Sequence, residues 1–370
     1  MGSIFELQKT SGKARAGLLK TSVGVVETPV FMPVGTRAAV KMLTCEDLED
    51  IGFDLILGNT YHLYLRPGHE LIERMGGLHD FMSWKGSILT DSGGFQVYSL
   101  SELNKVTDDG VWFRSHIDGS KHFIGPNESM QIQKSLGSDI VMCFDECPAL
   151  PCSNEKMKSS LDKTHRWAKQ CRDFELKEHQ NLFGIVQGGL DLNLRKESLE
   201  ALSEMNFEGM AIGGLSVGEK NDEMRELLQN FTHTMPVNKS RYLMGVGKPM
   251  DIIHAIGTGV DMFDCVLPTR NARNGQALTK KGPLNIKNER FKEDKQPLDA
   301  NCLCQACKRY SRSYIRHLFS VNEYTAGRLL TVHNLYFYSQ MMKDARVAIL
   351  ENKFDSFAQT FYKEFTSKDF

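Results

Sequence analysis

The 370-residue sequence contains no apolar run close to the roughly 20 residues that a membrane-crossing helix needs. Its first residues lack the apolar core of a secretory signal. The nine cysteines are an odd number, which argues against a disulfide framework in a chain without such a signal. These absences predict a cytoplasmic protein of a reducing compartment that is not bound to a membrane.

The chain also has little net charge, −1 at pH 7, and an ordinary globular composition with 41% hydrophobic residues. This near-neutrality hides an asymmetry. Residues 269–328 hold 13 Lys or Arg against 5 Asp or Glu, a balance of +8 that leaves −9 for the rest. Such a region is typical of a surface that binds a polyanion, although a solvated face would carry the same charges.

Low-complexity segments and close repeats are absent as well, but short apolar runs recur, each ending in a polar or glycine-rich cluster. Helical patterns separate several of these runs, for example at residues 154–177 and 221–233. Eight strands alternating with helices predict a TIM-type (β/α)8 barrel, although strand count alone also fits an open doubly wound sheet. The predicted strands are residues 30–34, 54–57, 87–89, 140–144, 182–186, 210–212, 242–246 and 260–263.

Two segments interrupt the alternation. Residues 104–124 carry turn residues between alternating β-formers, which predicts inserted hairpins. Residues 269–335 form a basic, cysteine-bearing insertion, followed by a helix at about 326–353 and helical sequence to about 368. We expect one barrel domain over residues 1–370 with an inserted subdomain at 269–335.

Acids and glycines follow the predicted strands, and in a parallel barrel these strand ends meet at one rim, where active sites lie. Asp264 stands among large apolar residues, which is costly unless it does chemistry or meets a cation. A carboxylate can be the covalent nucleophile at a sugar anomeric carbon, and a second one the general acid or base. Asp91 would supply the second, although in isolation it could equally cap a helix.

A flat ligand is suggested by other residues of this rim. The carboxylate of Asp145 could accept hydrogen bonds from the ring N–H and amine of a guanine-like base, or it could end its strand in a salt bridge. Gly93 and Gly94 allow backbone to approach a ligand closely, and Phe95 offers a stacking face.

Three cysteines lie within six residues, at Cys302, Cys304 and Cys307. Their thiolates can reach one tetrahedral ion at about 2.3 Å each. The fourth ligand would be His317 or His333. Because four protein ligands fill the coordination sphere, we predict a structural rather than catalytic zinc, with cysteines that bind no metal as the alternative.

Taken together, these motifs resemble the tRNA-guanine transglycosylases of bacterial type, also called queuine tRNA-ribosyltransferases. The resemblance extends from about Phe5 to Glu364 and includes the Cys-x-Cys-x2-Cys…His metal site. The matching stretches occur in order: Asp91-Ser-Gly-Gly-Phe-Gln, Phe144-Asp-Glu-Cys, Val186-Gln-Gly-Gly, Ile212-Gly-Gly-Leu-Ser-Val-Gly-Glu, Tyr242-Leu-Met-Gly-Val-Gly and Phe263-Asp-Cys-Val-Leu-Pro-Thr-Arg-Asn-Ala-Arg-Asn-Gly.

The resemblance implies a homodimeric pentosyltransferase that works in queuosine biosynthesis. The family's reaction replaces guanine at the wobble position of tRNAs with a G-U-N anticodon by a 7-deazaguanine base, 7-aminomethyl-7-deazaguanine. It implies that Asp264 bonds covalently to ribose C1′ in a double displacement and that Asp91 is the general acid and base. It also implies one structural Zn²⁺ per chain, with His333 as the fourth ligand.

By the same resemblance, two sets of residues bind the substrates. The base would be hydrogen-bonded by several groups and sandwiched by Phe95 and Met244, while the anticodon RNA would contact two segments of the rim. The base-binding set is Ser92, Gly93, Gly94, Phe95, Asp145, Gln187, Gly214, Leu215 and Met244. The RNA-binding set is Gly245, Val246, Gly247, Lys248, Pro249, Met250, Asp251, Thr269, Arg270, Asn271, Ala272 and Arg273.

One position departs from the family pattern: tyrosine is often found where Phe95 stands, so stacking survives but a hydroxyl is lost. Cys147 and Val217 follow the bacterial pattern, which suits the small aminomethyl base better than the bulkier queuine.

Two alternative functions are a barrel glycosidase and a non-catalytic RNA-binding subunit. The metal motif argues against the glycosidase, and the two aspartates argue against the non-catalytic subunit. A zinc deaminase would need a His-x-Glu before Pro-Cys-x-x-Cys, which the sequence lacks.

Overall fold

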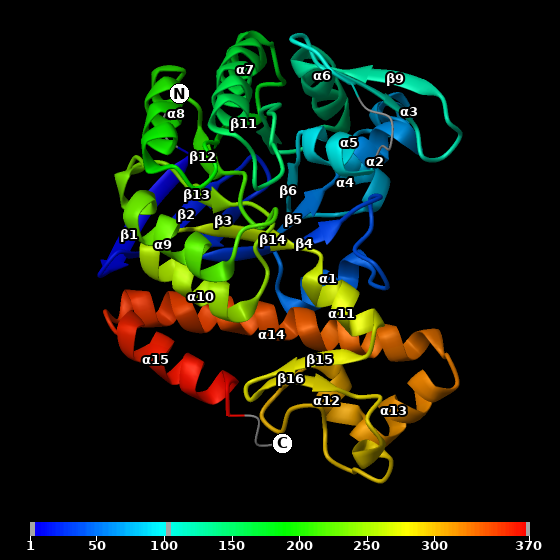
Figure 1. Ribbon diagram of the computed structural model, residues 1–370. Coiled ribbons are helices and arrows are strands. Elements are labelled where there is room, and N and C mark those ends of the chain that lie inside the picture. Colours follow the sequence, from blue (N-terminus) through cyan, green and yellow to red (C-terminus); the bar gives the residue numbers. More distant parts are fainter. Residues whose placement is uncertain (1–3, 101–104, 368–370) are drawn as a thin grey trace.

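The computed structural model describes residues 4–100 and 105–367, and its centre is a closed barrel of eight parallel strands (Figure 1). Around the barrel the strand order is β10-β11-β12-β13-β14-β4-β5-β6, so the last barrel strand of the chain closes on the first. This confirms the predicted barrel over an open sheet. The strands are β4 (Val30–Gly35), β5 (Leu55–Gly58), β6 (Ser87–Thr90), β10 (Ile140–Met142), β11 (Asn181–Val186), β12 (Gly209–Ile212), β13 (Arg241–Leu243) and β14 (Met262–Cys265).

All eight predicted strands exist, but some predicted ends are wrong. Strands β10 and β13 stop at Met142 and Leu243, not at residues 144 and 246. Strand β14 begins later and runs through Asp264, which pairs in register with Met32 of β4. The chain leaves the sheet early after β13 because Gly245 adopts a positive φ of 72° and turns its N–H toward Asp264.

Helices surround the barrel, and every segment predicted as helical contains one. Their starts follow ordinary capping rules: Ser153, for example, accepts from the backbone of Lys156 at the start of α7. The helices are α1 (Cys45–Ile51), α2 (Thr60–Leu65), α3 (His69–Arg74), α4 (Leu78–Met82), α5 (Gly94–Leu100), α6 (Pro126–Leu136), α7 (Asn154–Asp173), α8 (Leu192–Glu204), α9 (Asn221–Phe231), α10 (Pro249–Thr258), α11 (Leu267–Arg273), α12 (Gln305–Arg309), α13 (Arg312–Ser320), α14 (Tyr324–Leu350) and α15 (Phe354–Phe365), with 3-10 turns at Thr232–Thr234 and Glu289–Phe291.

An N-terminal antiparallel sheet, which the sequence did not predict, lies at the opposite end of the barrel from the rim. Its strands are β1 (Phe5–Ser11), β2 (Ala14–Lys20) and β3 (Val25–Thr28). Arg15 of this sheet pairs with Asp261 at 3.2 Å, and Ser22 donates to Asp139 at 2.7 Å. Because these aspartates precede strands β14 and β10, the sheet covers the amino ends of the barrel strands.

The inserted hairpins form a small antiparallel sheet of β7 (Lys105–Val106), β8 (Val111–Arg114) and β9 (Lys121–Ile124). Residue 104, the first of the predicted segment, lies outside the described residues. In Figure 1 this sheet lies at the edge of the molecule beside α6, away from the cysteine-bearing segment.

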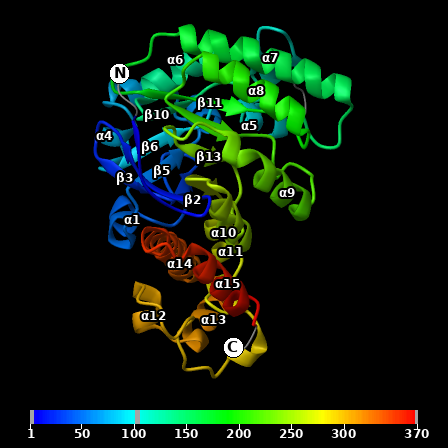
Figure 2. The ribbon, with the colours of Figure 1, turned by 90° about the vertical axis from the view of Figure 1, so that its left-hand side faces the viewer.

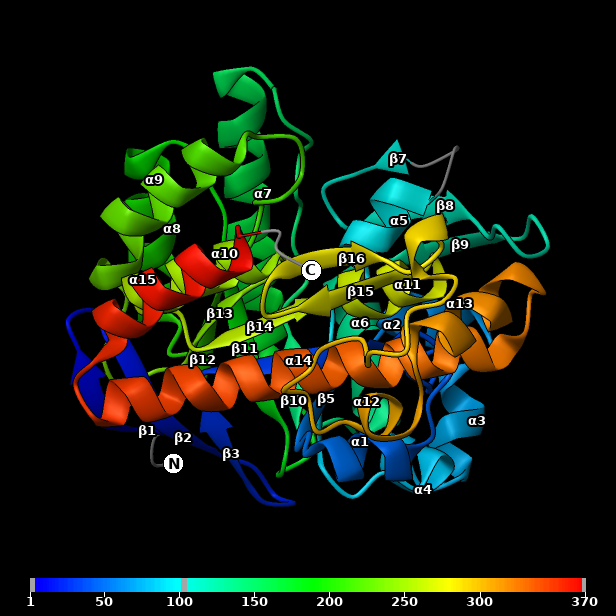
Figure 3. The same ribbon diagram turned by 90° about the horizontal axis from the view of Figure 1, so that it is seen from below.

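Helix α14 separates the barrel from the cysteine-bearing part of the chain. Its 27 residues span about 40 Å. Strands β15 (Gln276–Thr279) and β16 (Gly282–Asn285), with α12 and α13, lie on the side of α14 away from the barrel, as Figures 1 and 2 show. Seen from below in Figure 3, α14 crosses the molecule, and these elements lie beside the part of it that is nearer to α13. Asn334 of α14 joins them by accepting from Leu278 at 2.8 Å and donating to Pro268 at 3.0 Å.

Within the described ranges, no helix is long and apolar enough to cross a membrane.

Candidate active site and candidate metal site

Asp264 lies in β14 with its carboxylate at the mouth of the barrel. Its Oδ1 accepts from the Tyr242 hydroxyl at 2.6 Å and from the Gly245 backbone N–H at 2.7 Å. Burial raises the pKa of this carboxyl, and the two hydrogen bonds oppose the rise. Both of these hydrogen bonds are accepted by Oδ1. Within the described part of the chain, Oδ2 is therefore the oxygen that remains available to a ligand.

Asp91 follows β6 and faces the same mouth. Its Oδ1 accepts from the Thr60 backbone at 2.8 Å, and its Oδ2 accepts from the Asn59 amide at 2.5 Å. The residue is only 8% exposed, and burial together with the charge of Asp264 raises its pKa to about 7. A carboxyl with that pKa can both give and take a proton near neutral pH, as a general acid and base must.

The pKa values of Asp145, which is half-buried, and of its buried neighbour Glu146 are shifted in opposite directions. Glu146 is paired with Lys156 at 2.5 Å and Lys163 at 3.1 Å, and its pKa is lowered. Asp145 accepts instead from the Gln187 amide at 2.6 Å, and burial raises its pKa to about 6. The salt bridge that was the alternative for Asp145 is thus formed by Glu146, and Asp145 is the acid that can face the mouth.

Gln187 is fitted closely between Asp145 and a glycine turn after β12. A Cβ at Gly214, whose φ is 67°, would lie 2.3 Å from Gln187 Oε1, and one at Gly213 would lie 2.6 Å from its Nε2. Among the described residues, Gln187 Oε1 is buried without a hydrogen-bond donor. A buried acceptor without a partner is costly, so a ligand N–H at this place would satisfy it.

The other predicted base-binding residues occupy the same rim, after strands β6, β12 and β13. Ser92 donates to Asp145 at 3.5 Å, and Leu215 is buried. Phe95 is 48% exposed on α5, and Met244 is half-buried after β13. The sandwich of a base between Phe95 and Met244 stays a prediction.

The predicted RNA-binding residues differ in accessibility. Asp251, for example, is buried and paired with Arg225 at 2.6 Å. A buried side chain cannot reach RNA, although its backbone can, so the accessible members are the better candidates. Exposed or half-buried are Gly245, Lys248, Met250, Arg270, Asn271 and Arg273; buried are Val246, Gly247, Pro249, Asp251, Thr269 and Ala272.

Sequence reasoning assigned no role to three residues that hold the aspartates. Asn59 and Thr60 follow β5 and were visible only as a polar cluster at a strand end. Tyr242 was visible only as part of a motif, although a tyrosine in a buried strand needs a partner for its hydroxyl. Their partners follow from the closed barrel, which brings neighbouring strand ends together.

Three cysteines and one histidine converge beside α14. The ligand atoms of Cys302, Cys304, Cys307 and His333 all lie within 4.8 Å of one another. His333 Nδ1 is 3.6, 3.6 and 3.3 Å from the three sulfur atoms in that order. This cluster could hold one metal ion.

The orientation of His333 also fits metal binding. Its Nε2 lies 2.9 Å from the carbonyl oxygen of Leu278 and donates to it, which leaves Nδ1 as the nitrogen that faces the sulfur atoms. His317, the alternative ligand, lies in α13 and is not a member of the cluster. A set of three thiolates and one imidazole is a structural zinc set.

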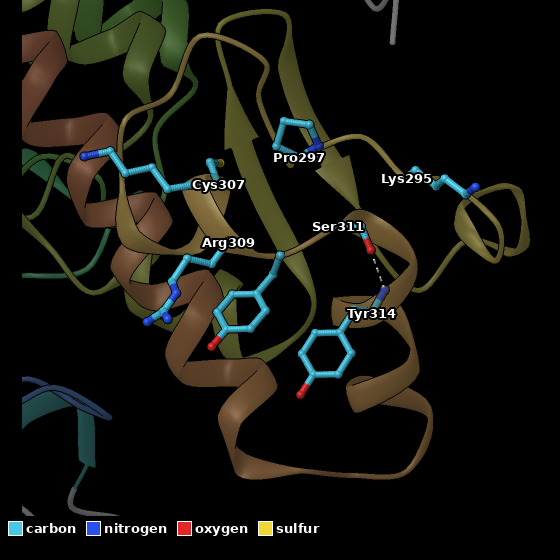
Figure 4. A pocket seen from close by; sticks show the side chains of 8 residues that line it. Lys295, Pro297, Cys307, Arg309, Ser311 and Tyr314 are labelled. Carbon is cyan, nitrogen blue, oxygen red and sulfur yellow. Dashed lines mark hydrogen bonds between the residues drawn. The ribbon is translucent and has the colours of Figure 1, made fainter.

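A hollow of 520 Å³ lies next to the cysteines in the basic part of the chain. Figure 4 shows Lys295, Arg309 and Tyr314 around it. The rings of Tyr310 and Tyr314 stack with centroids 5.4 Å apart. No acidic residue is among the described residues that line the hollow, so the positive balance predicted for this region is present at its surface.

Comparison with known proteins supports one family over nearly the whole chain. Residues 9–367 match the family model described as queuine tRNA-ribosyltransferase. The chain is 55% identical to a queuine tRNA-ribosyltransferase of Fusobacterium nucleatum, with 98% of each chain covered. It is 52% identical to one of Novosphingobium aromaticivorans, with 98% of this chain and 99% of the relative covered. A relative from Thermoanaerobacter sp. is 54% identical over 357 residues.

Proposed function

Because the chain belongs to the queuine tRNA-ribosyltransferase family, we propose that it exchanges guanine at the wobble position of G-U-N anticodon tRNAs for 7-aminomethyl-7-deazaguanine. The observation that carries this proposal is the pair of carboxylates in one barrel mouth, the half-buried Asp264 and the buried Asp91. Neither is paired with a cation among the described residues, and burial raises the pKa of both. Acids shielded in this way are typical of sites where they react.

In the first half of the reaction, Asp264 acts as the nucleophile. Its Oδ2 attacks ribose C1′ of the tRNA, and the bond between C1′ and guanine N9 breaks with its electron pair going to the base. Asp91 gives its proton to the departing guanine. Tyr242 and Gly245 hold Oδ1 and so fix the angle at which Oδ2 meets the sugar.

The second half reverses these roles. Asp91, now ionised, takes the N9 proton of the incoming 7-deazaguanine base, whose N9 then attacks C1′ and releases Asp264. One proton thus moves from Asp91 to guanine and one returns from the new base. A pKa of about 7 for Asp91 suits both transfers.

Recognition of the base would fall to the pocket beside these acids. Asp145 can accept from the ring N–H and the exocyclic amine of a guanine-like edge, and the unpartnered Oε1 of Gln187 can accept a further N–H. Gly214 and Leu215 would add backbone contacts, and Phe95 with Met244 would stack on the two faces. The base has to leave its stack to enter, which an anticodon loop permits at low cost.

The tRNA would be held by the exposed side of the rim and by the basic region. Lys248 and Arg270 are the exposed cations of the predicted RNA-binding set. We propose that residues 269–335 form an inserted subdomain whose zinc, held by three cysteines and His333, keeps this basic surface folded. The zinc would supply structure and take no part in the chemistry.

The enzyme would work as a homodimer. Analytical ultracentrifugation of the purified chain tests this oligomeric state.

Base exchange tests the proposal directly. Purified protein is incubated with labelled guanine and an unmodified G-U-N tRNA transcript, beside an Asp264→Asn variant. We expect label in the tRNA with the wild type alone. If a folded, metal-loaded, tRNA-binding wild type incorporates no label, the enzyme proposal is wrong and a non-catalytic RNA-binding role replaces it.

A further inference from the structure

The start of helix α2 holds the side chain of Asp91. Asn59 and Thr60 occupy its two carboxylate oxygens, and the Thr60 hydroxyl also donates to the Asp91 backbone carbonyl at 2.5 Å. The orientation of Asp91 therefore depends on how the first residues of α2 are themselves held.

Asn59 can donate to Asp91 only if its side-chain amide faces one way. Asn59 Oδ1 accepts from the backbone N–H of His62 at 3.1 Å and lies 2.5 Å from His62 Nδ1. Because an amide oxygen only accepts, the proton of this second bond belongs to His62 Nδ1. With both His62 donors on Oδ1, the NH2 group of Asn59 is left facing Asp91.

The surroundings of His62 keep it neutral. Burial, together with three nearby groups that can carry positive charge, lowers the pKa of its ring to about 4; these groups are Arg37, His116 and Lys41. A neutral imidazole has a single N–H, and the contact with Asn59 assigns it to Nδ1. The ring is thus a fixed donor at every pH at which the enzyme would work.

We propose that His62 is a positioning residue for the base exchange, acting through Asn59 to direct a hydrogen-bond donor at Asp91. The proposal rests on the proposed role of Asp91 as general acid and base. The titratable groups that face Asp91 are Asp264 on β14 and Tyr242 on β13. Against burial and against the charge of Asp264, three donors favour the ionised form of Asp91: the backbone groups of Thr60 and Gly93 and the side-chain amide of Asn59.

Loss of the Nδ1 donor has a defined consequence. The Asn59 amide would be held by one bond instead of two and could turn, which presents its oxygen to the Asp91 carboxylate. Asp91 would then lose its fixed orientation, and its pKa would rise because a donor to its charged form is lost.

Three variants isolate this effect. His62→Leu removes the donor, and His62→Asn restores one, because an asparagine Nδ2 stands close to where the histidine Nδ1 was. His122→Leu is the matched control: its ring also hydrogen-bonds a residue of α2, at 2.8 Å from the Tyr64 hydroxyl, but does not contact Asn59. Each is assayed for base exchange across pH and, with 15N-asparagine labelling, for the pH at which the Asn59 side-chain amide signal titrates.

We expect His62→Leu to lower kcat about three- to tenfold, with little change in KM for tRNA, and to move both pH midpoints upward by about half a unit to one unit. His62→Asn should recover most of the loss, and His122→Leu should match the wild type. An active wild type whose kcat and amide midpoint are unchanged by His62→Leu overturns the proposal. An inactive wild type would instead refute the proposed function, and the amide midpoint would still decide the role of His62.

Discussion

The barrel mouth and the cysteine-bearing region beside α14 both gather polar groups, but they hold them in different ways. At the mouth, Asp91 is buried and Asp264 and Asp145 are half-buried. All three accept hydrogen bonds from neutral donors, and shielding from solvent raises the pKa of each. Beside α14, four ligands converge on a point where one ion can satisfy them all. The first arrangement costs stability and is typical of reactive acids, whereas the second would stabilise its region once an ion is bound.

The adjacent acids Asp145 and Glu146 show the same contrast within the barrel. Two lysines compensate the charge of Glu146, whereas Asp145 accepts, among the described residues, from an amide and a distant hydroxyl. A carboxylate that is shielded from solvent and lacks a cation is typical of a site where a ligand uses it. The comparison therefore predicts that changes at the mouth reduce activity, whereas changes at the metal cluster reduce folding and RNA binding.

The largest effect is expected from Asp264→Asn. The variant keeps an oxygen for Tyr242 and Gly245, so the fold should persist, but the amide cannot attack C1′. Base exchange should fall by at least about a thousandfold without a fall in melting temperature. Asp173→Asn, an exposed acid on α7, serves as the control. Substantial exchange by the Asp264 variant would contradict the nucleophile assignment.

Cys304→Ser tests the cysteine-bearing region, where we expect an effect on metal content and tRNA binding. It should release the metal, as measured by atomic absorption, and weaken tRNA binding by about ten- to a hundredfold, the size expected for losing several phosphate contacts. Cys152→Ser, outside the cluster, should leave both unchanged. If Cys304→Ser lost the metal but bound tRNA as well as the wild type, the cluster would not support the RNA surface.

Tyr242→Phe tests how the barrel mouth sets the pKa of Asp264. It removes a hydrogen bond that favours the ionised form of Asp264, so the pKa of that carboxyl rises and fewer molecules are ready to attack at a given pH. We expect kcat to drop about tenfold and the acidic limb of the pH–rate profile to move to higher pH. Tyr64→Phe provides the comparison, and an unmoved acidic limb would remove Tyr242 from the mechanism.

Asp145→Asn should have the smallest effect of these variants. It should raise the melting temperature, whereas the other variants lower a rate or an affinity. Since the folded-state pKa of Asp145 is raised to about 6, the wild type loses stability as the pH rises from the ordinary aspartate pKa of about 3.9, and the penalty is complete above the folded-state pKa. The variant should melt a few degrees higher than the wild type at pH 8, and the difference should be clearly smaller at pH 4.5. Calorimetry at both pH values checks this, and equal differences at the two would contradict the raised pKa.

Much of this arrangement was predictable because it depends on local pattern. Buried apolar runs located the barrel strands, and the spacing of Cys302, Cys304 and Cys307 indicated a metal site. The partners of the acids were not predictable: Asn59 lies 32 residues before Asp91, and Tyr242 lies 22 before Asp264. Such pairs form only when the barrel closes, and so does the hydrogen bond from Gly245 to Asp264 that accompanies the early end of β13. The N-terminal sheet was missed because β1 is mostly exposed and because Arg15 interrupts the buried small and apolar residues of β2.

The central claim is that Asp264 bonds covalently to the tRNA ribose, and trapping that bond tests it most directly. Enzyme and G-U-N tRNA are mixed without free base, quenched in denaturant and digested, and the peptide containing Asp264 is examined by mass spectrometry. The account predicts a ribose-linked adduct on Asp264 in the wild type and none in Asp264→Asn. An adduct on another residue, or exchange of base with no adduct at any time point, would contradict it.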